Sequence, residues 1–135
     1  MSFAWGDFST LARELIDNSG ESEVPEAAIR ASLGRSYYAV FGVARNMVRE
    51  DGETVARHSA HASLRRILAE STDARRRRAA RALSRLFRLR IEADYYASPG
   101  IPLTRELAEE ACLVAEAALQ TLRLPDEPDP QQGRP

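Results

Sequence analysis

Residues 35–48 read RSYYAVFGVARNMV, and this stretch decides the fold. Apolar side chains recur in it every three or four positions, which is the period of one helix face. The pattern extends backwards to a start near residues 22–26, where Pro25 is tolerated in a first turn, and forwards to residue 49 or 50, before Asp51-Gly52. One long helix is therefore predicted. Its core-facing positions are Ile29, Leu33, Tyr37, Val40, Phe41, Ala44, Met47 and Val48.

Helical spacing also marks the sequence on both sides of this stretch. Further helices are predicted at about residues 7–18, 60–70, 74–97 and from a Thr104 cap to residue 122. Short breaks between long helices favour antiparallel neighbours. The fold class is thus all-α, an up-and-down bundle of four to five helices forming a single domain over residues 1–124. Residues 125–135 are Pro-rich and acidic, and we expect a disordered tail there.

Composition sets the expected compartment. Cys112 is the single cysteine of the 135 residues, so an intrachain disulfide has no second thiol and a reducing, cytoplasmic setting is expected. No stretch reaches the roughly 18 apolar residues of a membrane span. We therefore expect no membrane association.

Positive charge is concentrated in the middle of the chain. Residues 57–90 hold eleven arginines against Glu70 and Asp73, although the net charge of the whole chain is −1. Four of these arginines follow one side of the predicted fourth helix, namely Arg77, Arg81, Arg85 and Arg88. Such a ridge is suited to a nucleic-acid backbone, but a solvated helix face explains it equally well.

The second predicted helix carries an unusual face opposite its core stripe, with Arg35, Tyr38, Gly42 and Arg45 in line. Gly42 and Gly34 each cost about 1 kcal/mol relative to alanine inside a helix. Two such residues in one helix indicate close approach by another helix or a ligand. A homodimer seam is one such approach, and a dimer is predicted.

Arg90 and Asp94 fall on the apolar side of the fourth helix. Their i, i+4 spacing lets them form an ion pair. One interpretation is a buried clamp against the second helix, and the other is a polar cleft. His58 and His61 have no further Cys or His nearby, so neither a metal site nor a cofactor is predicted.

Two segments resemble the HEPN family. RSYYAVFGVARNMV, at 35–48, is similar to its Arg-x-Tyr-Tyr-Ala-x-Phe-His-x-Ala-Arg stretch, and LRIEADYY, at 89–96, is similar to its Arg-x-x-x-Asp-Tyr segment. His61 resembles the histidine that opens the family's short third helix. The resemblance implies a helical bundle, frequent dimerisation, and roles in bacterial toxin–antitoxin, antiphage or RNA-processing systems, sometimes beside a nucleotidyltransferase-type partner.

The sequence also departs from the family pattern. Gly42 stands where the family has histidine, and the Arg-x(4–6)-His motif of its ribonucleases is missing, because Arg57 and His61 are one residue too close and no histidine follows His61. Whether the chain is an enzyme is therefore left open at this point.

Three functional hypotheses follow. The first is a non-catalytic module that binds RNA, a nucleotide or a cognate partner, such as a nucleotidyltransferase-type antitoxin or another defence protein. Its cleft would be lined by Arg35, Tyr38, Arg90, Asp94 and Tyr95, with Arg45, Arg81, Arg85 and Arg88 as further ligand-binding candidates. The second is a metal-independent endoribonuclease toxin with Arg90, Asp94 and Tyr95 as catalytic candidates. Its weakness is that an unperturbed aspartate, with a pKa of about 3.9, is a poor acid at pH 7. The third is a domain that binds only protein.

Overall fold

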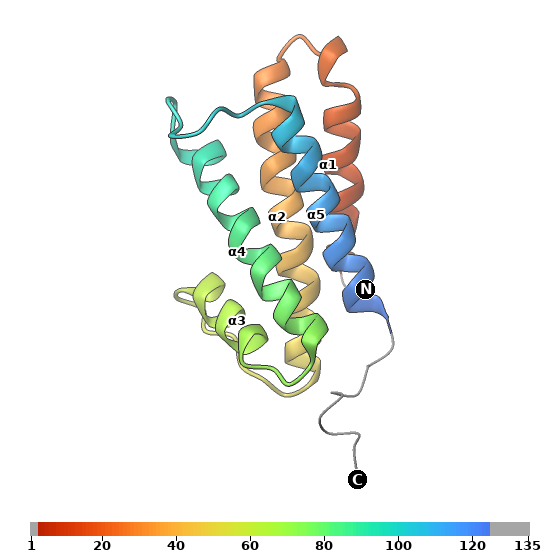
Figure 1. The fold of residues 1–135 in the computed structure, drawn as a ribbon, viewed down its shortest axis with the longest axis vertical. Coiled ribbons are helices and arrows are strands. Elements are labelled where there is room, and N and C mark those ends of the chain that lie inside the picture. Colours follow the sequence, from red (N-terminus) through yellow and green to blue (C-terminus); the bar gives the residue numbers. More distant parts are fainter. Residues whose placement is uncertain (1–2, 125–135) are drawn as a thin grey trace.

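Five α-helices build the chain in the computed structural model, which describes residues 3–124. They are α1 (Asp7–Asp17), α2 (Pro25–Glu50), α3 (Ala60–Ala69), α4 (Ala74–Tyr95) and α5 (Arg105–Arg123), with a 3-10 turn, η1 (Ser19–Glu21), between α1 and α2. The four long helices alternate in direction, and short α3 lies beside the first part of α4 (Figure 1). The predicted all-α bundle is confirmed. The predicted tail at 125–135 lies outside the described residues.

The helix ends have local causes that are visible in the sequence. Pro25 occupies the first turn of α2, where its missing N–H costs nothing, and Gly52 takes a left-handed φ of +87° just after the helix ends. The Asp73 carboxylate accepts the Arg75 backbone N–H at 2.9 Å, and the Thr104 hydroxyl accepts the Leu107 N–H at 3.1 Å. These caps satisfy N–H groups that have no partner inside their helices.

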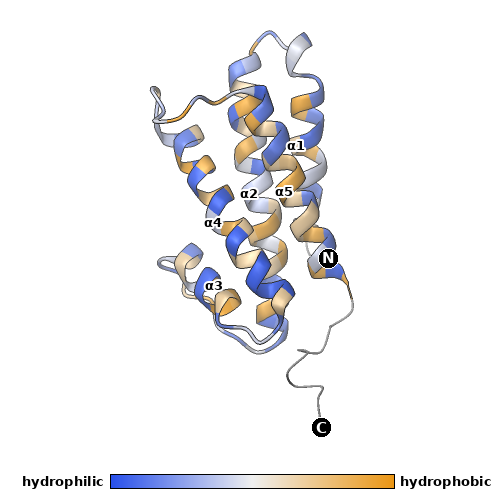
Figure 2. Ribbon diagram, viewed as in Figure 1, coloured by the Kyte–Doolittle hydropathy of each residue, from blue (hydrophilic) through white to orange (hydrophobic). Residues whose placement is uncertain are grey.

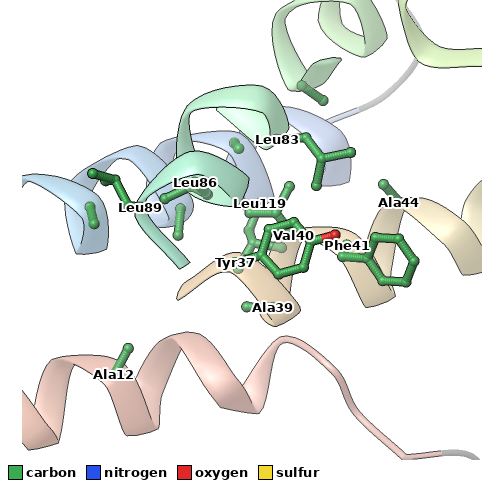
Figure 3. Packing of buried hydrophobic residues seen from close by; sticks show 14 of the residues in the cluster. Ala12, Tyr37, Ala39, Val40, Phe41, Ala44, Leu83, Leu86, Leu89 and Leu119 are labelled. Carbon is green, nitrogen blue, oxygen red and sulfur yellow. The ribbon is translucent and has the colours of Figure 1, made fainter. Parts of the chain in front are cut away.

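The core is centred on α2, which packs against α1, α4 and α5. Hydrophobic and hydrophilic residues are interspersed along each helix, and hydrophilic residues are dense in the first part of α4 (Figure 2). Leu83 and Leu86 from α4 and Leu119 from α5 gather over α2 (Figure 3). Burying each leucine contributes about 1.5–3 kcal/mol to stability, so these contacts determine how α4 and α5 pack on α2. No helix of residues 3–124 has the length and apolar character to cross a membrane.

A small polar group is buried between α2 and α5. Cys112 is 0% exposed, and its sulfur lies 3.6 Å from the Ser32 hydroxyl and 3.9 Å from the Ser36 hydroxyl. The Ser32 hydroxyl also donates to the Ala12 carbonyl at 2.9 Å, so the serine is satisfied inside the core. The single thiol is therefore a packing residue.

The two glycines of α2 differ in how closely the same chain approaches them. A Cβ at Gly42 would lie 2.2 Å from Trp5 Cγ, because the indole of the N-terminal segment rests directly on the helix. At Gly34 the nearest atom to such a Cβ would be Asp94 Oδ1, at 3.7 Å. Close packing is therefore present at Gly42, where a second copy of the chain is not needed to explain it, whereas Gly34 makes only an ordinary contact within residues 3–124. The homodimer stays a prediction that rests on the family resemblance.

Candidate functional site

Arg90 is the centre of a cluster of aromatic residues at the interface of α2, α3 and α4. Its guanidinium carbon lies 5.0 Å from the centroid of the Tyr38 ring, 5.5 Å from that of Tyr95 and 5.6 Å from that of Tyr37. Arg90 Nη2 also donates to the Tyr95 hydroxyl at 3.3 Å. The negative faces of three rings thus stabilise the cation and hold its plane in position.

Asp94 completes the charge pair expected at this place. Arg90 Nε lies 3.2 Å from Asp94 Oδ2, but the buried Nε–H makes no hydrogen bond, so the contact is an ion pair whose N–H is not aimed at the oxygen. The Arg90 side chain is 16% exposed and that of Asp94 is 38% exposed. The interpretation as a buried clamp is wrong for Asp94, because this carboxylate is at the surface above Gly34. The pair lines an open polar face.

His61 is brought into the same cluster from α3. Its ring stacks on Phe87 with centroids 3.7 Å apart and an interplanar angle of 12°. Its Nδ1 lies 3.3 Å from the Tyr37 hydroxyl. Sequence reasoning missed His61, Tyr37 and Phe87 as site residues, since Tyr37 and Phe87 follow the core pattern. The sequence signal for His61 was its resemblance to the histidine at the start of the family's third helix.

We call the set Tyr37, Tyr38, His61, Phe87, Arg90, Asp94 and Tyr95 the Arg90 cluster. Burial lowers the pKa of His61 to about 4, helped by the positive charges of Arg65 and Arg90, so the imidazole is neutral at pH 7. Burial also raises the pKa of Tyr37 well above its usual 10, which the Arg90 charge offsets only in part. The cluster therefore presents one fixed cation, one carboxylate, a neutral imidazole and a protonated phenol.

Arg35 lies elsewhere than predicted. Its guanidinium carbon is 5.0 Å from the Phe8 ring centroid, on the side of α2 that α1 covers, whereas Tyr38, Arg90, Asp94 and Tyr95 of the predicted cleft do come together. The reason is that Phe8 of α1 lies against Arg35, and the way in which α1 packs on α2 has no local signal in the sequence.

Arg45 is also held by aromatic rings. Its guanidinium carbon lies 5.1 Å from the ring centroids of both Trp5 and Phe41. Its Nε is buried without a hydrogen-bond partner, and burial, followed by the charge of Arg49, lowers the pKa of Arg45. Arg45 thus extends the arginine and aromatic contacts along α2, since Phe41 stacks on Tyr37 at 5.6 Å.

The arginine ridge of α4 is only partly as expected. Arg81, Arg85 and Arg88 are exposed, as predicted, but Arg77 is half-buried and donates to the Ser71 carbonyl at 2.8 Å. Arg85 forms an ion pair with Glu110 of α5. Within residues 3–124, no group of three or more His, Cys, Asp or Glu side chains is arranged to hold a metal ion.

A family model described as HEPN domain matches residues 12–124, which include most of α1 and all of α2 to α5. No curated protein and no solved structure matches the chain significantly.

Proposed function

The chain belongs to the HEPN domain family, as its match over residues 12–124 shows, and on this basis we propose that it binds RNA or a nucleotide through the Arg90 cluster. The observation that carries the proposal is the convergence of Arg90 with Tyr38, Asp94 and Tyr95 from two helices. Because the Arg-x(4–6)-His motif is missing from the sequence, the proposed role is binding without the ribonuclease chemistry that depends on that motif.

Arg90 is prepared to bind a phosphate. Three rings fix its guanidinium, so little side-chain freedom is lost when a ligand arrives. Its two Nη1 N–H groups make no hydrogen bond to any residue among 3–124 and can form a pair of bonds to phosphate oxygens. Tyr95, at 64% exposure, offers a ring face to a base.

The binding test uses a fluorescently labelled oligoribonucleotide and fluorescence anisotropy, with Arg90→Ala and Arg90→Lys against the wild type. We expect Arg90→Ala to weaken binding at least about tenfold, which is the usual worth of a charge-assisted pair of hydrogen bonds. Arg90→Lys should recover only part of this, because lysine keeps the charge but not the planar fork. Arg49→Ala is the matched control, since Arg49 is an exposed arginine on α2. Wild-type binding by folded Arg90→Ala would contradict the proposal.

We place this binding in a toxin–antitoxin or antiphage defence system, with a homodimer and a nucleotidyltransferase-type or other defence partner. The support is the family, together with the basic residues of α3 and α4. Expression in a bacterial host should arrest growth, and Arg90→Ala should relieve the arrest at an equal protein level. Sedimentation at micromolar concentration tests the homodimer, and a monomer of 15.0 kDa at every concentration would exclude it.

A metal-independent endoribonuclease is the second candidate, and the position of His61 favours it. The His61 imidazole is neutral at pH 7 and can accept the proton of a 2′-hydroxyl while Arg90 stabilises the phosphate charge, but its lowered pKa of about 4 makes it a weaker base than an ordinary histidine. In this version His61, and not Asp94, replaces the missing motif histidine. Cleavage of RNA by the wild type in the presence of EDTA, abolished in His61→Ala, would favour this candidate over simple binding.

A further inference from the structure

Helices α3 and α4 enclose a surface hollow of about 350 Å³ that is separate from the Arg90 cluster in its lining. We call it the α3–α4 groove. Its lining residues are Arg65, Ala69, Arg77, Ala80, Arg81, Ser84, Arg85 and Arg88. Five of the eight are arginines and none is acidic, so the groove has an excess of positive charge at its walls.

Most of that charge is not neutralised by the chain. Arg85 pairs with Glu110 and Arg77 donates to the Ser71 carbonyl. Arg65, Arg81 and Arg88 make neither an ion pair nor a side-chain hydrogen bond with any residue in the 3–124 range. Several like charges along one groove repel one another, and an anion bound between them removes that repulsion.

Helix geometry connects the groove to an exposed aromatic ring. Arg81, Arg88 and Tyr95 are seven residues apart, which is close to two turns, so all three lie along one side of α4. At 1.5 Å per residue they span about 21 Å of the helix. Glu92, the acidic residue between Arg88 and Tyr95, is half-buried and accepts the Gly100 N–H at 3.0 Å, so its charge is partly satisfied by the backbone.

We infer that the α3–α4 groove binds the sugar-phosphate backbone of single-stranded RNA, with phosphates on Arg65, Arg81 and Arg88 and an unstacked base on Tyr95. A charged groove with an exposed aromatic ring seven residues further along the same helix is the combination that single strands require, because every base has a face to stack. An acidic peptide would match the charge but not the ring. The inference rests on the proposed function in taking RNA as the ligand.

The test is the salt dependence of binding to a labelled 12-nucleotide oligo(U). Each neutralised phosphate contributes about −0.7 to the slope of log affinity against log salt. With Arg65, Arg81 and Arg88 in the groove and Arg90 in its cluster each bound to a phosphate, affinity should fall about 50-fold between 50 and 200 mM salt. The double variant Arg81→Ala/Arg88→Ala should reduce that fall to about 7-fold. The control Arg49→Ala/Arg57→Ala removes the same charge from exposed positions outside the groove and should keep the wild-type slope.

The variant Glu110→Gln should change the salt slope in the opposite direction. It releases Arg85 from its ion pair, so the slope should become steeper by about 0.7 and RNA should bind more tightly. An unchanged slope in Arg81→Ala/Arg88→Ala, or a poly-glutamate peptide that competes as well as unlabelled RNA of equal charge, would overturn the inference.

The same titrations separate this inference from the proposed function. Arg90→Ala should weaken binding at least about tenfold and reduce the salt slope by about 0.7, which is half the change expected for the double groove variant. If Arg90→Ala weakens binding but the groove variant behaves as the wild type, the proposed function stands and the groove inference is wrong. If only the groove variant changes, RNA binds along α3 and α4 without contacting Arg90, and the proposed function is wrong about its site.

Discussion

Gly42→Ala tests how the N-terminal segment packs on α2. In the structure Trp5 occupies the space that any side chain at position 42 would need. Trp5 is also the single tryptophan of the chain, so its fluorescence reports on this contact alone. The substitution thus adds one methyl group directly against the Trp5 indole.

The size of the effect can be worked out from the overlap. A Cβ at Gly42 would lie 2.2 Å from Trp5 Cγ and Cδ2 and 2.5 Å from Trp5 Cβ. Carbon atoms in ordinary contact are about 3.5–4.0 Å apart, so the tryptophan must retreat by about 1.5 Å. Because the Trp5 Cβ itself is in the clash, rotation of the ring does not relieve it and the backbone of the N-terminal segment must move.

The free energy of unfolding combines two opposing terms. Overpacking costs about 1–3 kcal/mol, whereas replacing a helical glycine by alanine gains about 1 kcal/mol. We therefore expect a net loss of about 0–2 kcal/mol, accompanied by a red-shifted tryptophan emission as the indole moves into water and leaves Arg45.

Gly34→Ala is the matched control in the same helix. Its Cβ would meet Asp94 Oδ1 at 3.7 Å, an ordinary contact, so this variant should gain up to about 1 kcal/mol with unchanged emission. Urea unfolding monitored by circular dichroism gives the stabilities, and emission spectra give the position of Trp5. If Gly42→Ala keeps the wild-type emission and is stabilised as much as Gly34→Ala, the tryptophan does not rest on α2.

The remaining predictions concern three other side chains. Asp94→Ala should cost about 1 kcal/mol or less, because Asp94 is 38% exposed, and a double-mutant cycle with Arg90→Ala should still give a coupling energy above zero. The free energy of unfolding should fall as pH is lowered from about 6.5 to about 4, since in that range the unfolded chain protonates His61 and the folded chain does not; His61→Phe should flatten this part of the curve. Cys112 should react with a thiol reagent only as fast as the chain unfolds, because it is 0% exposed, and rapid labelling of the native protein would refute the core position.

Most of the fold could be predicted from the sequence because its determinants are local. The start of α2 at Pro25, the caps at Asp73 and Thr104 and the turn at Gly52 each depend on a few neighbouring residues. The predicted end of α4 at residue 97 was two residues too late, since the helix ends at Tyr95. The 3-10 turn Ser19–Glu21 was missed because it has no periodic pattern of its own.

The candidate site could be predicted only where its residues share a helix. Arg90, Asp94 and Tyr95 are within two turns of α4, so their spacing was enough. The approach of His61 to Tyr37 depends on the angle at which α3 packs, and the coverage of Gly42 depends on a segment that precedes the first helix. Neither contact has a local signal, because each joins residues that are far apart in the chain.

Helix α4 contributes to both the Arg90 cluster and the α3–α4 groove, which lie on different sides of it, and Tyr95 is close to both. Toward α2, Arg90 depends on Tyr37 and Tyr38, so this part exists only when the bundle is packed. On the side of the groove, Arg81 and Arg88 are aligned by the helix itself, and the packing of α3 adds Arg65. Tyr95 accepts the Arg90 hydrogen bond and is also in line with Arg88, which precedes it by seven residues. A base stacked on Tyr95 would thus contact a ring that Arg90 already orients, which is why the same tyrosine can serve both the cluster and the groove.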